Sequence, residues 1–254
     1  MITAGIDVGS ISTKAALVRE DRLVHSVVIP TGYNARRAAD NVFEAVVSGA
    51  GLRAPDVTCI VATGYGRNSV DFADRTVTEI TCHAAGAHFT DPAVRCVIDI
   101  GGQDSKAIAL DENGRVRDFV MNDKCAAGTG RFLEVMARAL EVDLDAFGEM
   151  AGEADRPARI SSLCTVFAES EVISLIAQGE ARANIIAGIH DSIAARVAAM
   201  ARRIGVTPPV MMTGGVARNS GVVEALARQI GHPIRVTAHA QINGALGAAL
   251  LAAG

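Results

Sequence analysis

Tryptophan is missing from this 254-residue sequence, and other aromatic residues are scarce. There are two tyrosines, and aromatic side chains make up 4% of the chain. A surface for stacking nucleic-acid bases needs aromatic side chains, so we expect none here. Basic residues are not in excess, because the net charge is −4 and Lys and Arg form no stripe. These shortages argue against nucleic acid as a partner.

Long apolar runs are also lacking, although half of the residues are apolar. The longest runs are alanine-rich and are interrupted by Gly, Arg or Asp, so no segment is predicted to cross a membrane. The N-terminus reaches the charged Asp7 too early for a signal peptide. We therefore expect a cytoplasmic protein without a membrane partner, with ample length for a core.

Cysteine is scarce, and no CxxC pair occurs. The five cysteines are Cys59, Cys82, Cys96, Cys125 and Cys164. An odd number in a cytosolic chain argues against a disulfide framework. Cys59 and Cys96 lie in apolar segments predicted to be strands, and Cys82 lies beside His83 on a predicted helix. We assign these three cysteines, with His83, to structural roles, mainly core packing.

Apolar runs with β-branched residues alternate with alanine-rich helical stretches, which is typical of an α/β protein. The expected strands are residues 3–6, 15–18, 24–29, 58–62, 94–98, 107–110, 116–120, 210–213 and 234–236. The expected helices are residues 35–48, 79–88, 130–140, 166–178, 184–204, 221–230 and 243–251.

An internal repeat is the most informative feature. Residues 6–15, Ile-Asp-Val-Gly-Ser-Ile-Ser-Thr-Lys-Ala, match residues 98–107, Ile-Asp-Ile-Gly-Gly-Gln-Asp-Ser-Lys-Ala. Asp, Gly, Lys and Ala coincide, and apolar positions keep their type. Each copy predicts a strand, an Asp-x-Gly turn and a second strand. Two such hairpins facing each other would form a cleft between two related subdomains.

The repeated turn suits a polyphosphate. Asp7 and Asp99 would each place a carboxylate at a strand end, and the glycine that follows permits a tight turn. Either aspartate alone could cap an ordinary hairpin, but the duplication favours a shared site. Two carboxylates would repel a bare polyphosphate, so we expect Mg²⁺ between them and the anion, directly or through water. Lys14 would add positive charge beside a phosphate. Backbone N–H groups of small neighbouring residues would surround the phosphate oxygens; these residues are Gly9, Ser10, Ser12, Thr13, Gly101, Gly102 and Gln103.

A third glycine motif occupies residues 211–219, Met-Met-Thr-Gly-Gly-Val-Ala-Arg-Asn. A strand is expected to end there and turn into a helix, so that a purine or ribose lies near the helix N-terminus. The contacting residues would be Gly214, Gly215, Val216 and Asn219. An ordinary strand-to-helix turn is the alternative. Neither GxxxxGK[ST] nor GxGxxG occurs, which disfavours P-loop and Rossmann folds.

The order of these motifs resembles that of the actin, Hsp70 and sugar-kinase ATPase superfamily. The resemblance implies an α/β fold in which two duplicated RNase H-like subdomains close over Mg·ATP. Subdomain I would be residues 1–93, including the first phosphate motif and a connecting helix at residues 79–88. Subdomain II would be residues 94–254, and its C-terminal helix, residues 243–251, would return to subdomain I. Small residues in that helix favour a close crossing that suits a hinge. Gln103, Asp104 and Glu79 are equal candidates for orienting the hydrolytic water, the last by analogy with acidic residues on this connecting helix elsewhere in the superfamily.

Cys125 and Cys164 differ from the other cysteines. Each lies in a short stretch of small or polar residues that an amphipathic helix is predicted to follow, and a helix N-terminus stabilises a thiolate. A closed zinc or Fe–S site needs four ligands. Two cysteines per chain would complete such a site only on the two-fold axis of a symmetric dimer. From spacing alone, two unconnected cysteines are an equal alternative.

The surroundings of these cysteines resemble motifs of one ATPase family, the activators (component A) of 2-hydroxyacyl-CoA dehydratases. The matching segments are residues 122–132, Asn-Asp-Lys-Cys-Ala-Ala-Gly-Thr-Gly-Arg-Phe; residues 164–174, Cys-Thr-Val-Phe-Ala-Glu-Ser-Glu-Val-Ile-Ser; and residues 62–68, Ala-Thr-Gly-Tyr-Gly-Arg-Asn. The same family contains the ATPase subunits of benzoyl-CoA reductase. The resemblance runs from Asp7 to Leu250 without a departure at a motif position.

This resemblance implies a homodimer with one bridging [4Fe–4S] cluster, held by Cys125 and Cys164 of each subunit. It also implies that binding and hydrolysis of ATP rearrange the helices beside the cluster. One electron from reduced ferredoxin or flavodoxin would then pass to the dehydratase under anaerobic conditions and form a ketyl radical on the acyl-CoA, which permits loss of water. The acyl-CoA would bind the partner enzyme, so its identity leaves no trace in this sequence.

Three other functions are compatible with these motifs. An ATPase subunit of a benzoyl-CoA reductase complex would co-purify with other subunits. A small-molecule or sugar kinase would be colourless and phosphorylate a substrate, although the chain is short and lacks a sugar-binding insertion. A nucleotide-gated scaffold would hydrolyse little ATP and would tolerate loss of both cysteines.

Overall fold

Two five-stranded sheets share one topology. In the computed structural model, which describes residues 1–161 and 164–254, the strand orders are β3-β2-β1-β4-β5 and β10-β9-β6-β7-β8. In each sheet three consecutive strands are antiparallel, and the two later strands run parallel to the first. The second sheet therefore repeats the first strand for strand, which confirms the duplication predicted from residues 6–15 and 98–107.

The first sheet contains β1 (Ile2–Val8), β2 (Ser12–Arg19), β3 (Arg22–Pro30), β4 (Cys59–Thr63) and β5 (Arg75–Thr76). The second contains β6 (Cys96–Ile100), β7 (Ser105–Leu110), β8 (Val116–Asn122), β9 (Val210–Thr213) and β10 (Ile234–Val236). The helices are α1 (Ala35–Gly49), α2 (Glu79–Thr90), α3 (Gly130–Leu140), α4 (Phe147–Ala151), α5 (Thr165–Ala177), α6 (Arg182–Arg202), α7 (Ser220–Ile230) and α8 (Asn243–Leu251).

Most expected elements are present, but short ones and strand ends differ. β5 and α4 were not predicted, because two and five residues are too short to show a period. β6 lies two residues later than expected, over Cys96–Ile100. Asp99 therefore lies just inside the end of its strand, opposite Lys106, as Asp7 does opposite Lys14. The antiparallel ladder continues past each aspartate and holds its backbone in place.

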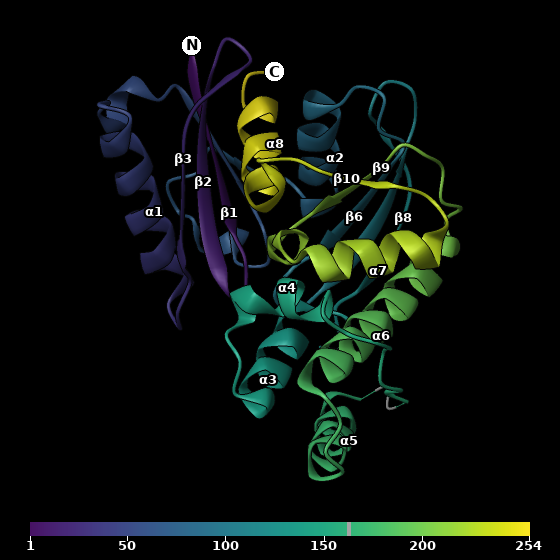
Figure 1. Cartoon of the computed structure of the whole chain (residues 1–254). Coiled ribbons are helices and arrows are strands. Elements are labelled where there is room, and N and C mark those ends of the chain that lie inside the picture. Colours follow the sequence, from purple (N-terminus) through teal and green to yellow (C-terminus); the bar gives the residue numbers. More distant parts are fainter. Residues whose placement is uncertain (162–163) are drawn as a thin grey trace.

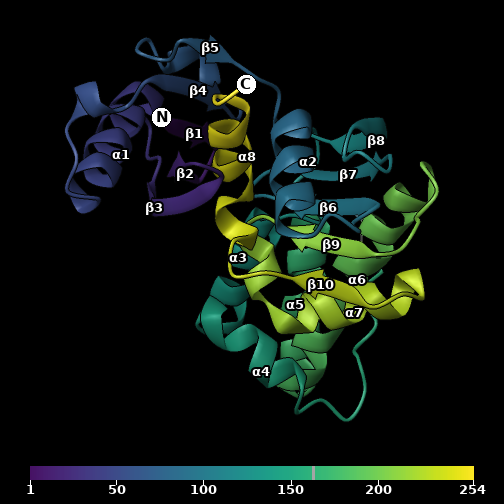
Figure 2. The same ribbon diagram turned by 90° about the horizontal axis from the view of Figure 1, so that it is seen from above.

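Helices α2 and α8 lie side by side between the two sheets (Figures 1 and 2). α8 packs on β1, β2 and β4, whereas α2 packs on β6 and β7. Glycines make this crossing close, because a Cβ on Gly247 would collide with the carbonyl oxygen of Cys82, and one on Gly86 with that of Asn243. The close crossing expected from small residues is thus confirmed, while its use as a hinge remains a prediction.

The remaining helices build two separate cores. α1 covers the first sheet, and α3, α6 and α7 share a larger core with the inner strands of the second sheet. Cys82 and Cys96 are buried and Cys59 is half-buried, in agreement with their assignment to core packing. Within the described ranges, no helix is both long and apolar enough to cross a membrane.

Helix α5 projects away from both sheets (Figure 1). It buries Ala168 and Val172 but leaves other large apolar side chains exposed. These exposed residues, which we call the α5 apolar face, are Val166, Phe167, Ile173 and Ile176. The expected amphipathic pattern is therefore wrong for α5, since the helix is apolar on its outer side as well.

Candidate functional site

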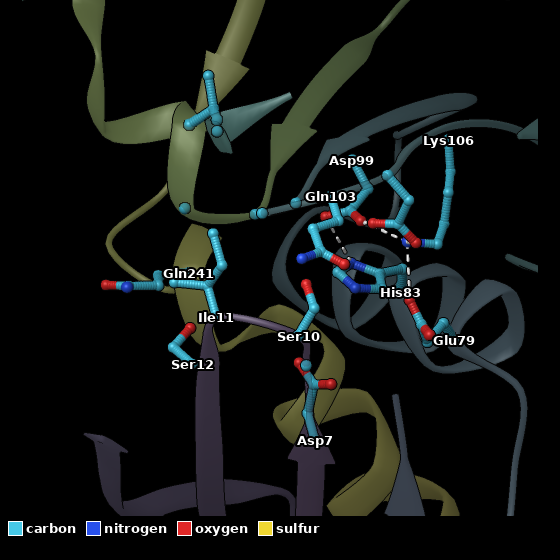
Figure 3. A pocket seen from close by; sticks show the side chains of 18 of the residues that line it. Asp7, Ser10, Ile11, Ser12, Glu79, His83, Asp99, Gln103, Lys106 and Gln241 are labelled. Carbon is cyan, nitrogen blue, oxygen red and sulfur yellow. Dashed lines mark hydrogen bonds and ion pairs between the residues drawn. The ribbon is translucent and has the colours of Figure 1, made fainter. Parts of the chain in front are cut away.

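A cavity of about 1560 Å³ opens between the two Asp-x-Gly hairpins. Asp7 and Asp99 enter it from opposite sides, one from each sheet (Figure 3). The two turns also touch, because a Cβ on Gly102 would lie 2.6 Å from the Ile11 side chain. Ligand sites commonly measure about 300–1,000 Å³, so this cavity has room for a nucleotide.

All but one of the residues assigned to Mg·ATP line this cavity. They are Asp7, Gly9, Ser10, Ser12, Lys14, Glu79, Asp99, Gly101, Gly102, Gln103, Asp104, Gly214, Gly215, Val216 and Asn219. Thr13 is the exception, because it is fully buried and its hydroxyl hydrogen-bonds that of Thr31 at 2.8 Å. Thr31 donates in turn to the Gly9 carbonyl at 2.7 Å. Thr13 thus supports the first turn from beneath, and its assignment to direct nucleotide contact is wrong.

A buried lysine that was not among the predicted site residues lies at the base of the cavity. The Lys106 ammonium is 2.7 Å from a carboxylate oxygen of Glu79, 2.7 Å from one of Asp104 and 3.2 Å from one of Asp99. Its counterpart in the first half is Lys14, which lies 3.2 Å from Asp7. The aligned lysines of the repeat were a signal that could have identified it.

The carboxylates around Lys106 differ in their proton affinity. Burial opposes ionisation of Asp99, but His83, Lys106 and a hydrogen bond from Thr213 outweigh it and lower the Asp99 pKa from 3.8 to about 2. Burial also opposes the charge on Lys106, yet the three carboxylates raise its pKa above the usual value. For Glu79 burial dominates, and its pKa is raised. Ionised Asp99 therefore stabilises the fold above about pH 4, and this contribution is lost as the pH falls through about 2.

The charge balance at the base of the cavity favours a divalent cation. The four carboxylates of Asp7, Glu79, Asp99 and Asp104 face the ammonium groups of two lysines, a formal excess of two negative charges. Within the described part of the chain, no three His, Cys, Asp or Glu residues are grouped to hold a metal by themselves. Mg²⁺ commonly takes one or two carboxylates plus phosphate oxygens and water. Asp7 and Asp99 therefore fit Mg²⁺ that binds together with a nucleotide.

Three elements meet in hydrogen bonds beside Asp99. The Thr213 hydroxyl of β9 donates to Asp99 Oδ1 at 3.0 Å. His83 Nδ1 of α2 lies 3.1 Å from that hydroxyl and 3.4 Å from Asp99 Oδ1, and the Asn243 amide of α8 donates to the His83 carbonyl at 2.9 Å. His83 also lines the cavity. These contacts agree with the structural role expected for His83 and also place it in the cavity wall beside Asp99.

The duplication also extends beyond the two hairpins. Thr63 pairs with Asp7 between β4 and β1, and Thr213 pairs with Asp99 between β9 and β6. The glycine after each threonine has a left-handed φ, +91° in the first half and +88° in the second. A Cβ there would lie 2.6 Å or 2.8 Å from the aspartate carboxylate of the same half. Each Thr-Gly pair thus leaves space for its aspartate side chain.

The adenosine motif differs in detail from the expected strand-to-helix turn. A 3₁₀ turn, Gly215–Arg218, separates β9 from α7. Asn219 is the N-cap of α7, where its Oδ1 accepts from the Val222 N–H at 3.1 Å while its Nδ2 lies 3.3 Å from His190 Nε2. The amide of Asn219 is therefore engaged within the protein. The backbone of Gly215 is instead accessible from the cavity, because a Cβ there would meet nothing within 4 Å.

The three candidates for orienting the hydrolytic water all line the cavity, but they are held differently. Glu79 and Asp104 each form an ion pair with Lys106. Gln103 is exposed, and its side chain extends into the cavity toward Ser10 (Figure 3). The geometry thus brings Gln103, Glu79 and Asp104 together around one space.

The segment that bears Cys125 is bonded to the second phosphate turn. The Gly130 N–H donates to the Gly101 carbonyl at 2.9 Å, and the Arg131 N–H donates to the Gly102 carbonyl at 2.8 Å. These are the first two residues of α3. A displacement of the phosphate turn would therefore pull directly on the start of this helix.

Cys125 and Cys164, the two candidate cluster ligands, occupy different local structures. Cys164 is the exposed N-cap residue of α5, as the sequence predicts, although Ser162 and Leu163 before it lie outside the described residues. Cys125 is half-buried and precedes α3 by five residues, so its expected place at a helix N-terminus is wrong. A turn closed by the Thr129 hydroxyl and the Ala126 carbonyl separates Cys125 from the helix.

Replacing Lys106 by methionine is expected to lower the free energy of unfolding by about 3–5 kcal/mol at pH 7, because buried carboxylates would lose their shared cation. The loss should be smaller at pH 5 than at pH 7, since burial raises the pKa of Glu79 and a lower pH favours its neutral form. Urea unfolding at both pH values measures this. Lys14→Met is the control with a smaller expected loss, because Lys14 is more exposed and pairs with Asp7. Equal losses for Lys106→Met at both pH values would contradict the charge argument.

Comparison with known proteins gives matches along nearly the whole chain. Residues 4–252 match the BadF/BadG/BcrA/BcrD ATPase family. The activator of lactoyl-CoA dehydratase from Anaerotignum propionicum is 50% identical, over 99% of this chain and 97% of its own.

Two crystal structures are similar to this one along nearly the whole chain. Component A of the Acidaminococcus fermentans (R)-2-hydroxyglutaryl-CoA dehydratase has a TM-score of 0.96 at 46% identity, covering 99% of this chain and 97% of its own. The 2-hydroxyisocaproyl-CoA dehydratase activator from Clostridium difficile with bound ADPNP has a TM-score of 0.95 at 47% identity, covering 99% of this chain and 94% of its own.

More distant matches bear on the fold and on the alternatives. A glucokinase from Streptomyces griseus has a TM-score of 0.62 at 16% identity, covering 100% of this chain and 99% of its own, which shows the sugar-kinase-like fold alone. One of the subunits of benzoyl-CoA reductase from Thauera aromatica is 35% identical, over 90% of this chain and 83% of its own. With matched motifs, fold and nearly full coverage, the chain belongs to the BadF/BadG/BcrA/BcrD ATPase family.

Proposed function

We propose that this protein is the ATP-dependent activator of a 2-hydroxyacyl-CoA dehydratase. The observation that carries the proposal is similarity at 46–50% identity, along nearly the whole chain, to proteins named as such activators or as component A. The benzoyl-CoA reductase subunit is a more distant relative, at 35% identity. The protein would act in the cytoplasm, as its five free cysteines suggest.

In this proposal the cavity between the hairpins binds Mg·ATP. Asp7 and Asp99 hold Mg²⁺, directly or through water, and Lys14 neutralises phosphate charge. The turn residues from Gly9 to Ser12 and from Gly101 to Gln103 present backbone N–H groups to the phosphates. Gly214 and Gly215 support the adenosine. Gln103, Asp104 or Glu79 orients the attacking water.

Cys125 and Cys164 are proposed to ligate a [4Fe–4S] cluster shared by two subunits. When bound, the cluster supplies the single electron, received from reduced ferredoxin or flavodoxin, that the dehydratase requires. The chain's own residues fit this group, because the Arg196 guanidinium lies 3.5 Å from Cys125 Sγ and would favour an anionic thiolate. A four-cysteine site built from two thiols per chain requires a dimer.

The α5 apolar face supports a homodimer. Val166 and Phe167, immediately after Cys164, are 66% and 68% exposed. Ile173 is 54% exposed one to two turns further along the helix. Burying these side chains against a second copy would remove apolar surface from water and bring the two Cys164 residues toward one axis.

Coupling between nucleotide and cysteines is proposed to follow the bonded path through α3. Residues 1–93 and 94–254 would be the two moving units, with α2 and α8 crossing between them. Closure around nucleotide would displace Gly101 and Gly102. Because these residues accept hydrogen bonds from Gly130 and Arg131, α3 and the Cys125 segment would move with them.

Anaerobic purification followed by iron, sulfide and activity assays tests this function. We expect about four iron and four sulfide per dimer, as one [4Fe–4S] cluster requires. We also expect ATP-dependent activation of a 2-hydroxyacyl-CoA dehydratase component, with reduced ferredoxin as the donor. The activator should work below the stoichiometric amount and dissociate readily from its partner.

Each rival function predicts a different result. A colourless, iron-free protein that phosphorylates a small molecule would indicate a kinase. Stable co-purification with further subunits and reduction of an aromatic acyl-CoA would indicate a component of a benzoyl-CoA reductase. Negligible ATP turnover, together with silent replacement of both Cys125 and Cys164, would indicate a scaffold.

A further inference from the structure

An arginine of α6 reaches the sulfur atom of Cys125. Arg196 Nη2 donates to Cys125 Sγ at 3.5 Å, although the two residues are 71 positions apart in the sequence. The nucleotide cavity is lined by neither residue. This contact therefore belongs to the cysteine region and has no part in the binding of Mg·ATP described above.

Packing holds Arg196 in this position. Gly128 lies over its aliphatic stem with a φ of +90°, and a Cβ there would lie 3.2 Å from Arg196 Cδ. The next residue of α6, Val197, is buried in the core. On the other side of the loop, the Asn122 amide donates to the Cys125 carbonyl at 2.8 Å. The thiol and the guanidinium are thus both fixed by neighbouring groups.

We propose that Arg196 is a positioning residue that acts through Cys125 Sγ and holds the reduction potential of the cluster above the value it would otherwise have. This inference rests on the proposed function, because it requires that Cys125 be a cluster ligand. Arginine keeps its positive charge at every physiological pH. Hydrogen bonds to the ligating sulfur and nearby net charge are among the factors that set Fe–S potentials.

The direction of the effect follows from charge. Reduction adds one electron, taken from the ferredoxin or flavodoxin donor, to a centre already bound by anionic thiolates. A guanidinium beside one of those sulfurs stabilises the added negative charge. Arg196 therefore makes the cluster easier for the donor to reduce, and loss of its charge should make reduction harder.

Arg203 provides a matched control at the end of the same helix. It lies seven residues further along the chain, two turns and about 10 Å away, and so projects from a similar face. Both arginines line a small cavity of about 340 Å³ beside β7 and β8. Arg203 is exposed, so water and salt screen its charge more strongly than that of Arg196, which is half-buried.

The test is a redox titration of anaerobically prepared wild type, Arg196→Gln, Arg196→Lys and Arg203→Gln, monitored by electron paramagnetic resonance with titanium(III) citrate as reductant. We expect Arg196→Gln to make one-electron reduction about tenfold less favourable, a fall in midpoint potential of about 59 mV. Arg196→Lys should restore at least half of this loss, because it keeps the charge. Arg203→Gln should match wild type.

Iron analysis separates the possible failures. Wild type without iron would overturn the proposed function rather than the role of Arg196. Full iron in all variants with an unchanged or higher potential in Arg196→Gln would overturn the role of Arg196 alone, as would equal shifts in Arg196→Gln and Arg203→Gln. If Arg196→Gln and Arg196→Lys both lose iron, Arg196 is a structural support of the loop and the proposal is overturned. If only Arg196→Gln loses iron, the Arg196→Lys potential decides, and a value above wild type, or one more than about 30 mV below it, overturns the proposal.

Discussion

Replacing Cys164 by alanine is expected to remove the cluster iron completely from the anaerobically prepared protein. A four-cysteine site shared by two chains loses two of its four ligands when one cysteine per chain is changed. Cys125→Ala should have the same result for the same reason. Iron and sulfide content per dimer and the visible absorbance measure the loss. Cys59→Ala is the control, because Cys59 lies half-buried in β4 of the first sheet.

The oligomeric state and nucleotide affinity give independent readouts for the same variants. Loss of the shared ligand should weaken the proposed dimer, which would then be held by the α5 apolar face alone. Nucleotide binding should survive in part, because neither cysteine lines the cavity. Wild-type iron content in Cys125→Ala or Cys164→Ala would remove that cysteine from the assignment, whatever the activity.

Asp7→Asn should reduce Mg-dependent ATP hydrolysis by about 10²–10³-fold, since Mg²⁺ positioned on phosphate contributes several kcal/mol of transition-state stabilisation. Asparagine keeps the shape of Asp7 but removes the charge that faces both Lys14 and the expected metal. Asp99→Asn should lose turnover to a similar extent. Steady-state ATPase assays over a range of Mg²⁺ concentrations measure the effect, with thermal unfolding to verify the fold.

Asp71→Asn is the control for these variants. Asp71 also forms an ion pair, in its case with Arg36, but both side chains are more than half exposed and lie outside the cavity. Its turnover should equal that of wild type, because exposed ion pairs contribute little. If Asp7→Asn and Asp99→Asn both retain wild-type turnover, the cavity is not the site of ATP hydrolysis, and the proposed role of Asp7 and Asp99 in holding Mg·ATP is contradicted.

Much of the fold could be predicted from the sequence because its signals are local. Short apolar runs identify β1 and β2, and Asn219 and Gly231 lie at the two ends of α7 as its caps. Short elements such as β5 and α4 were missed because they contain less than one clear period. The apolar outer side of α5 was also missed, since a helix with apolar residues around most of its circumference lacks a single apolar stripe.

The site was only partly predictable. Asp7 and Asp99 could be identified because the same turn occurs twice, and a repeat is visible without knowledge of the fold. Lys106 was present in that repeat but could not be distinguished from Lys14. Its special position depends on Glu79, which reaches it only because α2 packs on the second sheet.

The sequence by itself determined the α/β class, the duplicated aspartate hairpins, the glycine-rich third motif and the separate character of Cys125 and Cys164. These features depend on the order of neighbouring residues and on the short-range geometry of turns and strands. Only the tertiary structure decided that Lys106 joins three carboxylates, that His83 lies beside Asp99 and that Arg196 reaches Cys125. Such contacts join residues far apart in the chain, and their strength comes from burial, which exists only after the helices have packed on the sheets.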